Sequence, residues 1–350
     1  KQWIQQVTDR ALEILDLKSE GVALDDLISQ CHAVLSRRGE ATGLALAGSV
    51  VASWLALESN QHLSFFQALI AEFGPDQERL EQAIADYQKS VDDVNVMRLH
   101  QAAEAKRQEL FRRINAAPNG LQTLILMREA LRRLLREHPE LKPIDQDLVH
   151  LFTSWFNKGF LRLERIDWQT PAAVLEKLIQ YESVHEIQGW DDLRRRLAED
   201  RLCFAYFHPV IPDEPLIFVE VALVQGMSDA VAPLLDSPPA PPIAADTAVF
   251  YSINNCQPGL AGVSFGNLLI KQVVSVLQAE HPRLKRFVTL SPIPGLRLWL
   301  ETEGLEFLHR FESSDDETAL KSIVAQYLTS GRGAKLKDPV ARFHLGNGAD

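Results

Sequence analysis

The first half of the chain carries apolar residues at the spacing of one face of an α-helix. The pattern starts at Trp3 and Val7, and the stretch 44–57 is apolar on most faces. Apolar residues three and four positions apart indicate an amphipathic helix, and turn-forming residues mark where a helix ends. Such turns occur at Gly74-Pro75, Pro118-Asn119-Gly120 and His138-Pro139. We therefore expect residues 1–155 to form an all-helical domain of roughly seven or eight helices.

Pairs of basic residues lie among glutamates on these predicted helices. The pairs are Lys106-Arg107, Arg112-Arg113 and Arg132-Arg133. Arginine and glutamate at helical spacing commonly form ion pairs on a solvated helix face, and we expect this arrangement here. The alternative is a contact with another subunit or with a ligand.

The pattern changes near Trp155, after which predicted helices and strands alternate. Residues 203–207 and 216–223 are rich in β-branched and aromatic residues and are bounded by prolines, as is typical of strands. One helix is predicted to start at Thr170, with this threonine as its cap and Pro171 in its first turn. Further helices are predicted over 190–197 and 317–328, and the proline-rich stretch 236–246 suits an exposed connection. We expect residues 156–350 to form a mixed α/β domain.

Within this second half, residues 247–300 predict a strand, a glycine-bearing turn, an amphipathic helix and a second strand. Glycines let the backbone approach a ligand, and the free N–H groups at a helix start can bind an anion such as pyrophosphate. The same glycines are compatible with plain turn chemistry, and neither a dinucleotide-binding GxGxxG nor a Walker lysine is present. The candidate ligand-binding residues are Gly262, Val263, Ser264, Phe265, Gly266 and Asn267.

Three further polar residues are candidates for chemistry. Ser291 follows the second strand and precedes Pro292, which restricts its backbone to extended conformations; the alternative is a serine that caps a turn. His344 is followed by Gly-Asn-Gly, which predicts a tight turn that would place the imidazole at a pocket edge for proton exchange near neutral pH. His208, at the end of a predicted strand, is a comparable candidate for substrate binding.

The composition of the chain mainly excludes certain classes of function and structure. The net charge of −11 argues against nucleic-acid binding, which depends on neutralising phosphates. Three cysteines, Cys31, Cys203 and Cys256, form no CxxC pair, which argues against a zinc site or a disulfide framework and fits a reducing compartment. The longest apolar run, 43–57, is shorter than the roughly twenty residues that span a bilayer, so we expect a buried helix. The chain begins with Lys1 and not with Met, and we expect both ends to be trimmed, so targeting segments are not judged.

Three segments, in this order, resemble the malonyl-CoA decarboxylase family. They are FYSINNCQPGLAGVSFGNLLIKQVV from Phe250, LSPIPG from Leu290 and ARFHLGNGA from Ala341. The likeness extends to SWFNKGFLRLERIDW from Ser154 and FVEVAL from Phe218, so it covers nearly the whole chain.

The resemblance implies a helical N-terminal domain used in oligomerisation and a C-terminal domain of the GNAT acetyltransferase fold. It implies malonyl-CoA as substrate and acetyl-CoA and CO2 as products, with no cofactor and no metal because the coenzyme A thioester is itself the substrate. The family's catalytic serine falls on Ser291, its catalytic histidine on His344 and its coenzyme A pyrophosphate loop on 262–266. Some relatives carry an acidic residue at the position of Ser264. The acetyltransferase loop pattern R/Q-x-x-G-x-G/A is also degraded here, since its first position falls on Ala261.

Two other functions fit the same residues. One is an acyl-CoA-dependent acyltransferase of the GNAT fold, and the other is a non-catalytic protein that binds coenzyme A and serves as a scaffold. The resemblance leads us to expect a homo-oligomer, a dimer or tetramer, with neither a nucleic-acid partner nor a membrane span. We expect the bacterial cytoplasm as its compartment, or mitochondria or peroxisomes if the source is eukaryotic.

Overall fold

The structure is a computed structural model, and it describes residues 23–36, 40–157, 159–263, 266–303, 309, 316–329 and 338–348. The chain divides into two compact units. The helical unit comprises Lys1–Arg162, Phe207–Glu214 and Gln257–Ser264, and the sheet unit comprises Leu163–Tyr206, Pro215–Cys256 and Phe265–Asp350. Two short segments from the second half of the chain therefore belong, by their contacts, to the helical unit.

The helical unit is built from amphipathic helices whose apolar faces meet in a shared core. Its elements are α2 (Leu24–Ser36), α3 (Glu40–Leu55), η1 (Ser59–Gln61), α4 (His62–Glu72), α5 (Gln77–Lys89), α6 (Asp93–Ala103), α7 (Lys106–Ala116), α8 (Gly120–Leu134), η2 (Pro139–Leu141), α9 (Lys142–Trp155) and η3 (Pro258–Leu260). On α7, for example, Leu110, Phe111 and Ile114 lie on one face and are buried. The prediction of a helical first half is confirmed.

Helix α3 is the apolar run that the sequence predicts to be a buried helix. Val50, Val51 and Trp54 on α3 are at most 5% exposed, so this helix packs inside the unit. Among the described residues, no single helix has both the length and the apolar character needed to cross a membrane. Ala41–Leu55 and Ser59–Glu72 meet that test only as a pair, and they are bent by 110° to each other.

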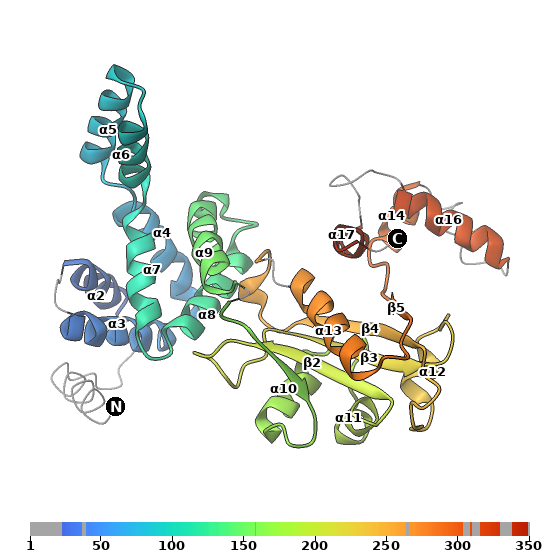
Figure 1. The fold of residues 1–350 in the computed structure, drawn as a ribbon. Helices are drawn as coiled ribbons and strands as arrows, with labels where there is room; N and C mark the ends of the chain where they lie inside the picture. Colours follow the sequence, from blue (N-terminus) through green and yellow to red (C-terminus); the bar gives the residue numbers. More distant parts are fainter. Residues whose placement is uncertain are drawn as a thin grey trace. The chain divides into compact units, whose positions relative to one another are not determined.

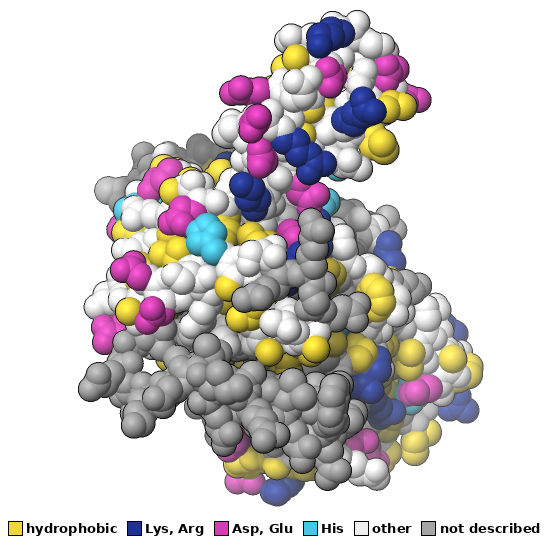
Figure 2. Space-filling view, turned by 90° about the vertical axis from the view of Figure 1, so that its left-hand side faces the viewer, with side chains coloured by type: hydrophobic (Ala, Val, Ile, Leu, Met, Phe, Trp, Pro, Cys, Tyr) yellow, Lys and Arg dark blue, Asp and Glu magenta, His cyan; other side chains and the backbone are white. Residues whose placement is uncertain are grey.

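Helices α5 and α6 form a hairpin that extends away from the other helices of the unit (Figure 1). Each helix begins with an aspartate whose carboxylate accepts a hydrogen bond from a backbone N–H of the first turn, Asp76 from Arg79 at 3.2 Å and Asp92 from Asn95 at 2.9 Å. Figure 2 shows apolar side chains at the surface of this hairpin. The large exposed ones are Ile84, Val91, Val94, Val96 and Met97.

The sheet unit contains one five-stranded sheet in the order β1-β2-β3-β4-β5. The strands are β1 (Arg162–Ile166), β2 (Arg201–Phe207), β3 (Ile217–Val224), β4 (Thr247–Asn255) and β5 (Arg286–Thr289). The helices are α10 (Ala172–Tyr181), α11 (Trp190–Arg196), α12 (Ala232–Asp236), α13 (Gly266–Glu280), α14 (Leu296–Glu303), α16 (Glu317–Thr329) and α17 (Pro339–Gly346). Helices α10 and α11 cover one face of the sheet and α13 covers the other (Figure 1). This arrangement confirms a mixed α/β second half.

Strands β2, β3 and β4 are antiparallel, whereas β4 and β5 are parallel. The register of β3 and β4 shifts after Glu220, so that Tyr251 is an extra residue on β4, which is a β-bulge. Strands β4 and β5 pair only over Thr247–Phe250, and the last hydrogen bond between these segments runs from Leu290 N to Phe250 O at 2.8 Å. Beyond Phe250, no strand in the described part of the chain pairs with that side of β4.

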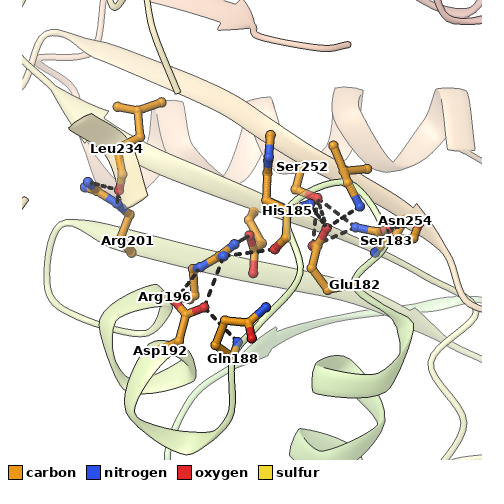
Figure 3. Close-up of polar contacts among 12 residues, drawn as sticks. Glu182, Ser183, His185, Gln188, Asp192, Arg196, Arg201, Leu234, Ser252 and Asn254 are labelled. Atoms are coloured by element: carbon orange, nitrogen blue, oxygen red, sulfur yellow. Dashed lines mark hydrogen bonds and ion pairs between the residues drawn. The ribbon is translucent and has the colours of Figure 1, made fainter. Parts of the chain in front are cut away.

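A buried carboxylate fixes the segment after α10 to β4. Glu182 accepts hydrogen bonds from Ser252 Oγ and Asn254 Nδ2, each at 2.7 Å, and from the backbone N–H groups of Val184 and His185, each at 2.8 Å (Figure 3). A carboxylate with this many donors tolerates burial because its lone pairs are satisfied. The C-terminal end of β4 is thereby bound to the segment that follows α10.

An ion pair does the same for α11 and β3. Arg196 donates to Glu220 Oε2 at 2.8 Å, to Asp192 Oδ1 at 3.1 Å and to the carbonyl of His185 at 2.9 Å (Figure 3). Burial raises the pKa of Glu220 to about 7, although the charge of Arg196 opposes the rise. The attraction between this pair therefore does not fully offset the burial of the carboxylate.

One local prediction fails at the start of α10. Thr170 does not cap this helix: Pro171 occupies the N-cap position, and no side chain makes a capping hydrogen bond. The hydroxyl of Thr170 instead accepts a hydrogen bond from the backbone N–H of Asp167 at 3.0 Å, upstream of the helix. A threonine can bond in either direction, and here the preceding turn provides the donor.

The expectation of solvated ion pairs holds for some of the basic pairs and is wrong for Arg107. Arg113 and Arg133 pair with the glutamates four residues before them. Arg107 is only 6% exposed, and its Nε donates to Asp147 Oδ2 of α9 at 2.6 Å. Because α9 covers this face of α7, the guanidinium needs a partner inside the unit.

Candidate active site

Ser291 and His344 meet in the sheet unit although they lie 53 positions apart. The Ser291 Oγ and the His344 Nε2 are 2.9 Å from each other, which is hydrogen-bond distance. Ser291 follows β5 and precedes Pro292, and His344 lies near the end of α17. The structure therefore brings together the two residues that the sequence singles out for chemistry.

One buried carboxylate links the segments that carry these two residues. Asp338 is 3% exposed and caps α17, since its Oδ1 accepts from the backbone N–H groups of Val340 and Ala341, each at 2.9 Å. Its Oδ2 accepts from the backbone N–H of Gly295 at 3.3 Å and from the hydroxyl of Tyr327 at 3.1 Å. Asp338 thus fixes the start of the histidine helix against the segment that follows the serine.

Close packing reinforces this link. A Cβ added at Gly295 would lie 2.1 Å from the Tyr327 hydroxyl, so the segment after Ser291 approaches α16 more closely than any larger residue allows. Beneath it, side chains of α14 and α16 form an apolar cluster of Trp299, Leu300, Ile323 and Tyr327. Ile293 packs against this cluster and Gly295 against Tyr327, so the segment that follows Ser291 is held closely.

Burial lowers the pKa of His344 and so favours the neutral form of its imidazole. A neutral imidazole has one N–H and one lone pair, and it can orient the Ser291 hydroxyl from either side of the hydrogen bond. The predicted tight turn after His344 is wrong in part: α17 continues through Gly346, and the left-handed residue is Gly348, with φ of 88°. The histidine is held by a helix and not by a turn.

The candidate coenzyme loop leaves β4 and passes through η3 before α13 begins. Gly262 has a φ of 84°, which favours glycine, and its position is exposed, whereas Val263 is buried at 9% exposure. Ser264 and Phe265 lie outside the described residues. For Gly266 and Asn267 the structure describes only the backbone, which is the first turn of α13. The ligand-binding role of these six residues stays a prediction.

Arg128 of α8 contacts this loop, and nothing in its local sequence pattern points to that role. Its Nη1 donates to the carbonyls of Gly259 at 2.6 Å and Ala261 at 2.8 Å, and its Nε donates to Asp145 Oδ1 at 2.8 Å. All four residues belong to the helical unit. The first of these carbonyls lies 131 positions after Arg128 in the chain. The residues around Arg128 therefore give no indication of the contact.

His208, the third candidate, follows β2 and is 8% exposed. Its ring lies 5.2 Å from the ring of Phe156, and its Nδ1 accepts from the backbone N–H of Val210 at 3.2 Å. Burial lowers the pKa of His208. These contacts are those of a packed histidine that fixes a turn, and its predicted role in substrate binding stays a prediction.

The fold and the site define a two-part protein of the helical plus α/β class, with a serine and a histidine paired at the end of a parallel strand. The sequence agrees with that description over most of its length. Residues 73–156 match the model of the malonyl-CoA decarboxylase N-terminal domain, and residues 159–323 match that of the malonyl-CoA decarboxylase C-terminal domain. The chain belongs to the malonyl-CoA decarboxylase family.

Solved structures of this family have the same fold. The malonyl-CoA decarboxylase of Rhodopseudomonas palustris is 48% identical, with a TM-score of 0.86, and that of Agrobacterium vitis is 46% identical, with a TM-score of 0.84. Each match covers 93% of this chain and 86% of the other. The mitochondrial malonyl-CoA decarboxylase of Anser anser anser is 35% identical over 69% of this chain, and that of Mus musculus is 32% identical over 72%. This chain spans 58% and 61% of the length of these two curated relatives.

Proposed function

We propose that this protein converts malonyl-CoA to acetyl-CoA and CO2. The observation that carries the proposal is the 2.9 Å contact between Ser291 and His344, the two positions on which the family's catalytic serine and histidine fall. Support comes from the similar chains reported above, which are malonyl-CoA decarboxylases from bacteria and from mitochondria.

The proposed reaction breaks the bond between the carboxylate carbon and the α-carbon. The electron pair of that bond moves to the α-carbon and into the thioester carbonyl, which gives CO2 and an enolate. A proton from solvent then reaches the α-carbon and completes acetyl-CoA. The thioester is the electron sink, so no metal or organic cofactor takes part in the proposed reaction. Catalysis depends on stabilising the enolate oxygen more strongly than the ground-state carbonyl.

Ser291 and His344 supply these needs in the proposed mechanism. The Ser291 hydroxyl donates a hydrogen bond to the oxygen that gains negative charge, or to the malonyl carboxylate. The neutral imidazole of His344 orients that hydroxyl and relays the solvent proton toward the α-carbon. Asp338 keeps the two residues in register through Gly295 and the first turn of α17.

The coenzyme would bind through backbone groups. The resemblance implies that residues 262–266 bind the pyrophosphate, and the free N–H groups at a helix start suit an anion of this kind. In the described part of the chain, no strand pairs with β4 beyond Phe250 on the side from which β5 departs. An extended chain with amide groups, such as pantetheine, can bond to such an edge. Ser291 follows directly after that departure, which suits a thioester at the end of the pantetheine chain. The mixed sheet with its parallel β4–β5 pair is consistent with the expected GNAT fold.

A malonyl-CoA assay without any acceptor tests the proposal. We expect the wild type to release CO2 and acetyl-CoA from malonyl-CoA alone, and Ser291→Ala to lose turnover while it still binds coenzyme A. Strict dependence on an amine or hydroxyl acceptor would instead establish an acyltransferase. Binding of coenzyme A without turnover by the wild type would establish a binding protein.

We further propose that the protein is a homo-oligomer, supported by the exposed apolar side chains on the α5–α6 hairpin. Mass measurement in solution tests this for the wild type and for Val94→Glu with Met97→Glu, which we expect to dissociate or to lose an assembly step. The bacterial cytoplasm is the proposed compartment, because the relatives of bacterial origin are more similar than the mitochondrial ones. Fractionation of the source cells tests it.

A further inference from the structure

The glycine loop has a buried support that the proposed reaction does not use directly. We propose that Arg128 of α8 is a positioning residue for the backbone of residues 259–262, and that the position of this backbone contributes to the affinity for the nucleotide end of coenzyme A. The inference rests on the proposed binding of coenzyme A at the loop.

The contacts of Arg128 define the path of the loop. One nitrogen, Nη1, donates to two carbonyls, those of Gly259 at 2.6 Å and Ala261 at 2.8 Å. These residues flank Leu260, whose side chain is 3% exposed. With both carbonyls bonded to one rigid group, the backbone from 259 to 261 has a fixed direction. Gly262 follows at once, with its φ of 84°, and the chain turns there toward α13.

Burial makes these contacts necessary for Arg128 itself. The residue is 1% exposed, and Asp145 of α9 is its ionic partner at 2.8 Å. Burial lowers the pKa of Arg128, and the hydrogen bond and charge of Asp145 oppose that change. A guanidinium is planar with five N–H donors, and any donor left unpaired inside the protein is costly. The two loop carbonyls satisfy donors that Asp145 leaves free.

A second contact with α8 places the loop independently of Arg128. A Cβ added at Gly259 would lie 2.1 Å from the carbonyl oxygen of Ile125, so the loop backbone touches α8 without an intervening side chain. Ile125 and Arg128 are three residues apart and lie on the same face of α8. The same face of α8 therefore packs closely against the loop and donates hydrogen bonds to it.

The test compares two substrates that differ only at the nucleotide end. Malonyl-CoA contains the pyrophosphate and malonyl-pantetheine lacks it, so only the first depends on the loop. For Arg128→Met we expect KM for malonyl-CoA to rise about ten- to hundredfold, the range for losing charged hydrogen bonds. KM for malonyl-pantetheine and kcat for both substrates should stay within roughly threefold. Arg128→Lys keeps the charge but not the forked geometry, and we expect an intermediate rise.

Arg107→Met is the matched control. Arg107 is also buried and also pairs with an aspartate of α9, Asp147, but no loop carbonyl is among its hydrogen-bond partners in the described residues. We expect it to lower the melting temperature as Arg128→Met does and to leave the ratio of the two KM values unchanged. A rise of the ratio in Arg107→Met as well would overturn the inference, because loss of any buried pair would then suffice.

An equal change of KM for both substrates in Arg128→Met, or no change of KM for either, would also overturn the inference. If Arg128→Met does not fold, the ratio for Arg128→Lys decides in the same way. The proposed function is judged separately, on turnover of malonyl-CoA by the wild type. Should the wild type bind coenzyme A without turnover, the proposed function fails, and the Kd values for coenzyme A and pantetheine in the same variants still decide the role of Arg128.

Discussion

Two buried charges, Arg128 in the helical unit and Asp338 in the sheet unit, organise backbone in opposite ways. Arg128 donates hydrogen bonds to carbonyl groups, those of Gly259 and Ala261. Asp338 accepts hydrogen bonds from N–H groups, those of Gly295, Val340 and Ala341, and from the Tyr327 hydroxyl. In each case a single side chain fixes a segment that we associate with substrate.

The difference lies in what each charge depends on. Arg128 reaches a carbonyl 131 positions away and has an ionic partner in Asp145. The partners shown for Asp338 are neutral, and all come from the last sixty residues of the chain. The backbone of residues 259–261 is therefore held within the helical unit, whereas the serine–histidine pair is supported inside the sheet unit. Changes near Arg128 should affect affinity, and changes near Asp338 should affect turnover.

The largest effect is expected from His344→Asn. A positioned acid–base group contributes about 10²- to 10⁴-fold, so kcat for malonyl-CoA should fall by that range. The Kd for coenzyme A should not change, because the loop is untouched. His150→Asn, at an exposed position on α9, is the control and should keep full turnover. Near-normal kcat in His344→Asn would remove this residue from the mechanism.

Gly259→Ala comes next and acts on the other side of the comparison. The new Cβ would lie 2.1 Å from the Ile125 carbonyl oxygen, so the loop must move away from α8. We expect a loss of about 1–3 kcal/mol in the free energy of unfolding and a KM for malonyl-CoA raised by at least about tenfold. Gly48→Ala in α3, where a Cβ meets nothing within 4 Å, should be neutral or stabilising. Unchanged KM in Gly259→Ala would show that substrate binding does not depend on the close contact between the loop and α8.

Asp338→Ala should have a moderate effect on two measurements. Loss of the cap on α17 should cost about 0.5–2 kcal/mol of the free energy of unfolding. Because Gly295 and α17 also lose their link, kcat should fall while the Kd for coenzyme A stays the same. Asp92→Ala removes the cap of α6, where Asp92 accepts from Asn95 N at 2.9 Å, without a link to Ser291 or His344. A fall in kcat in both variants would mean that stability alone explains it.

The smallest effect on turnover is expected from Glu220→Gln, which instead changes how stability depends on pH. The unfolded chain releases the proton of a glutamate near pH 4.3, whereas burial raises the pKa of Glu220 in the folded protein to about 7. The native state therefore binds more protons in between, and its free energy of unfolding should fall as pH rises from about 4.3 to about 7. Glu220→Gln should flatten that decrease when melting temperatures are measured across the range. Glu186→Gln, at an exposed position, should not.

Sequence patterns predicted the parts of the molecule that depend on local spacing. The helical first half and the strands at 203–207 and 216–223 follow from periodicity, and the structure confirms them. The resemblance selected Ser291 and His344, and the structure shows them in contact, although their catalytic role stays a proposal. The domain limits 1–155 and 156–350 stay a prediction as well.

The hydrogen-bond partners of individual side chains could not be predicted from the sequence. Thr170 had donors on either side, and the sequence does not say which one its hydroxyl bonds to. Arg107 and Arg128 look like ordinary helix-surface arginines until the element that covers each of them is known. The same holds for Glu220, whose burial follows from the packing of α11 on β3.

The bond between Arg128 and Gly259 also has a consequence for the time course of synthesis. A ribosome adds about 5–20 residues each second, so on the order of 10 s separates the appearance of Arg128 from that of its carbonyl partner 131 positions later. During that interval the helices can assemble around Arg128 and Asp145, but the face of α8 that receives the loop stays open to water. The helical unit is completed only by residues that the ribosome makes after most of the sheet, so the nascent protein finishes its first unit late.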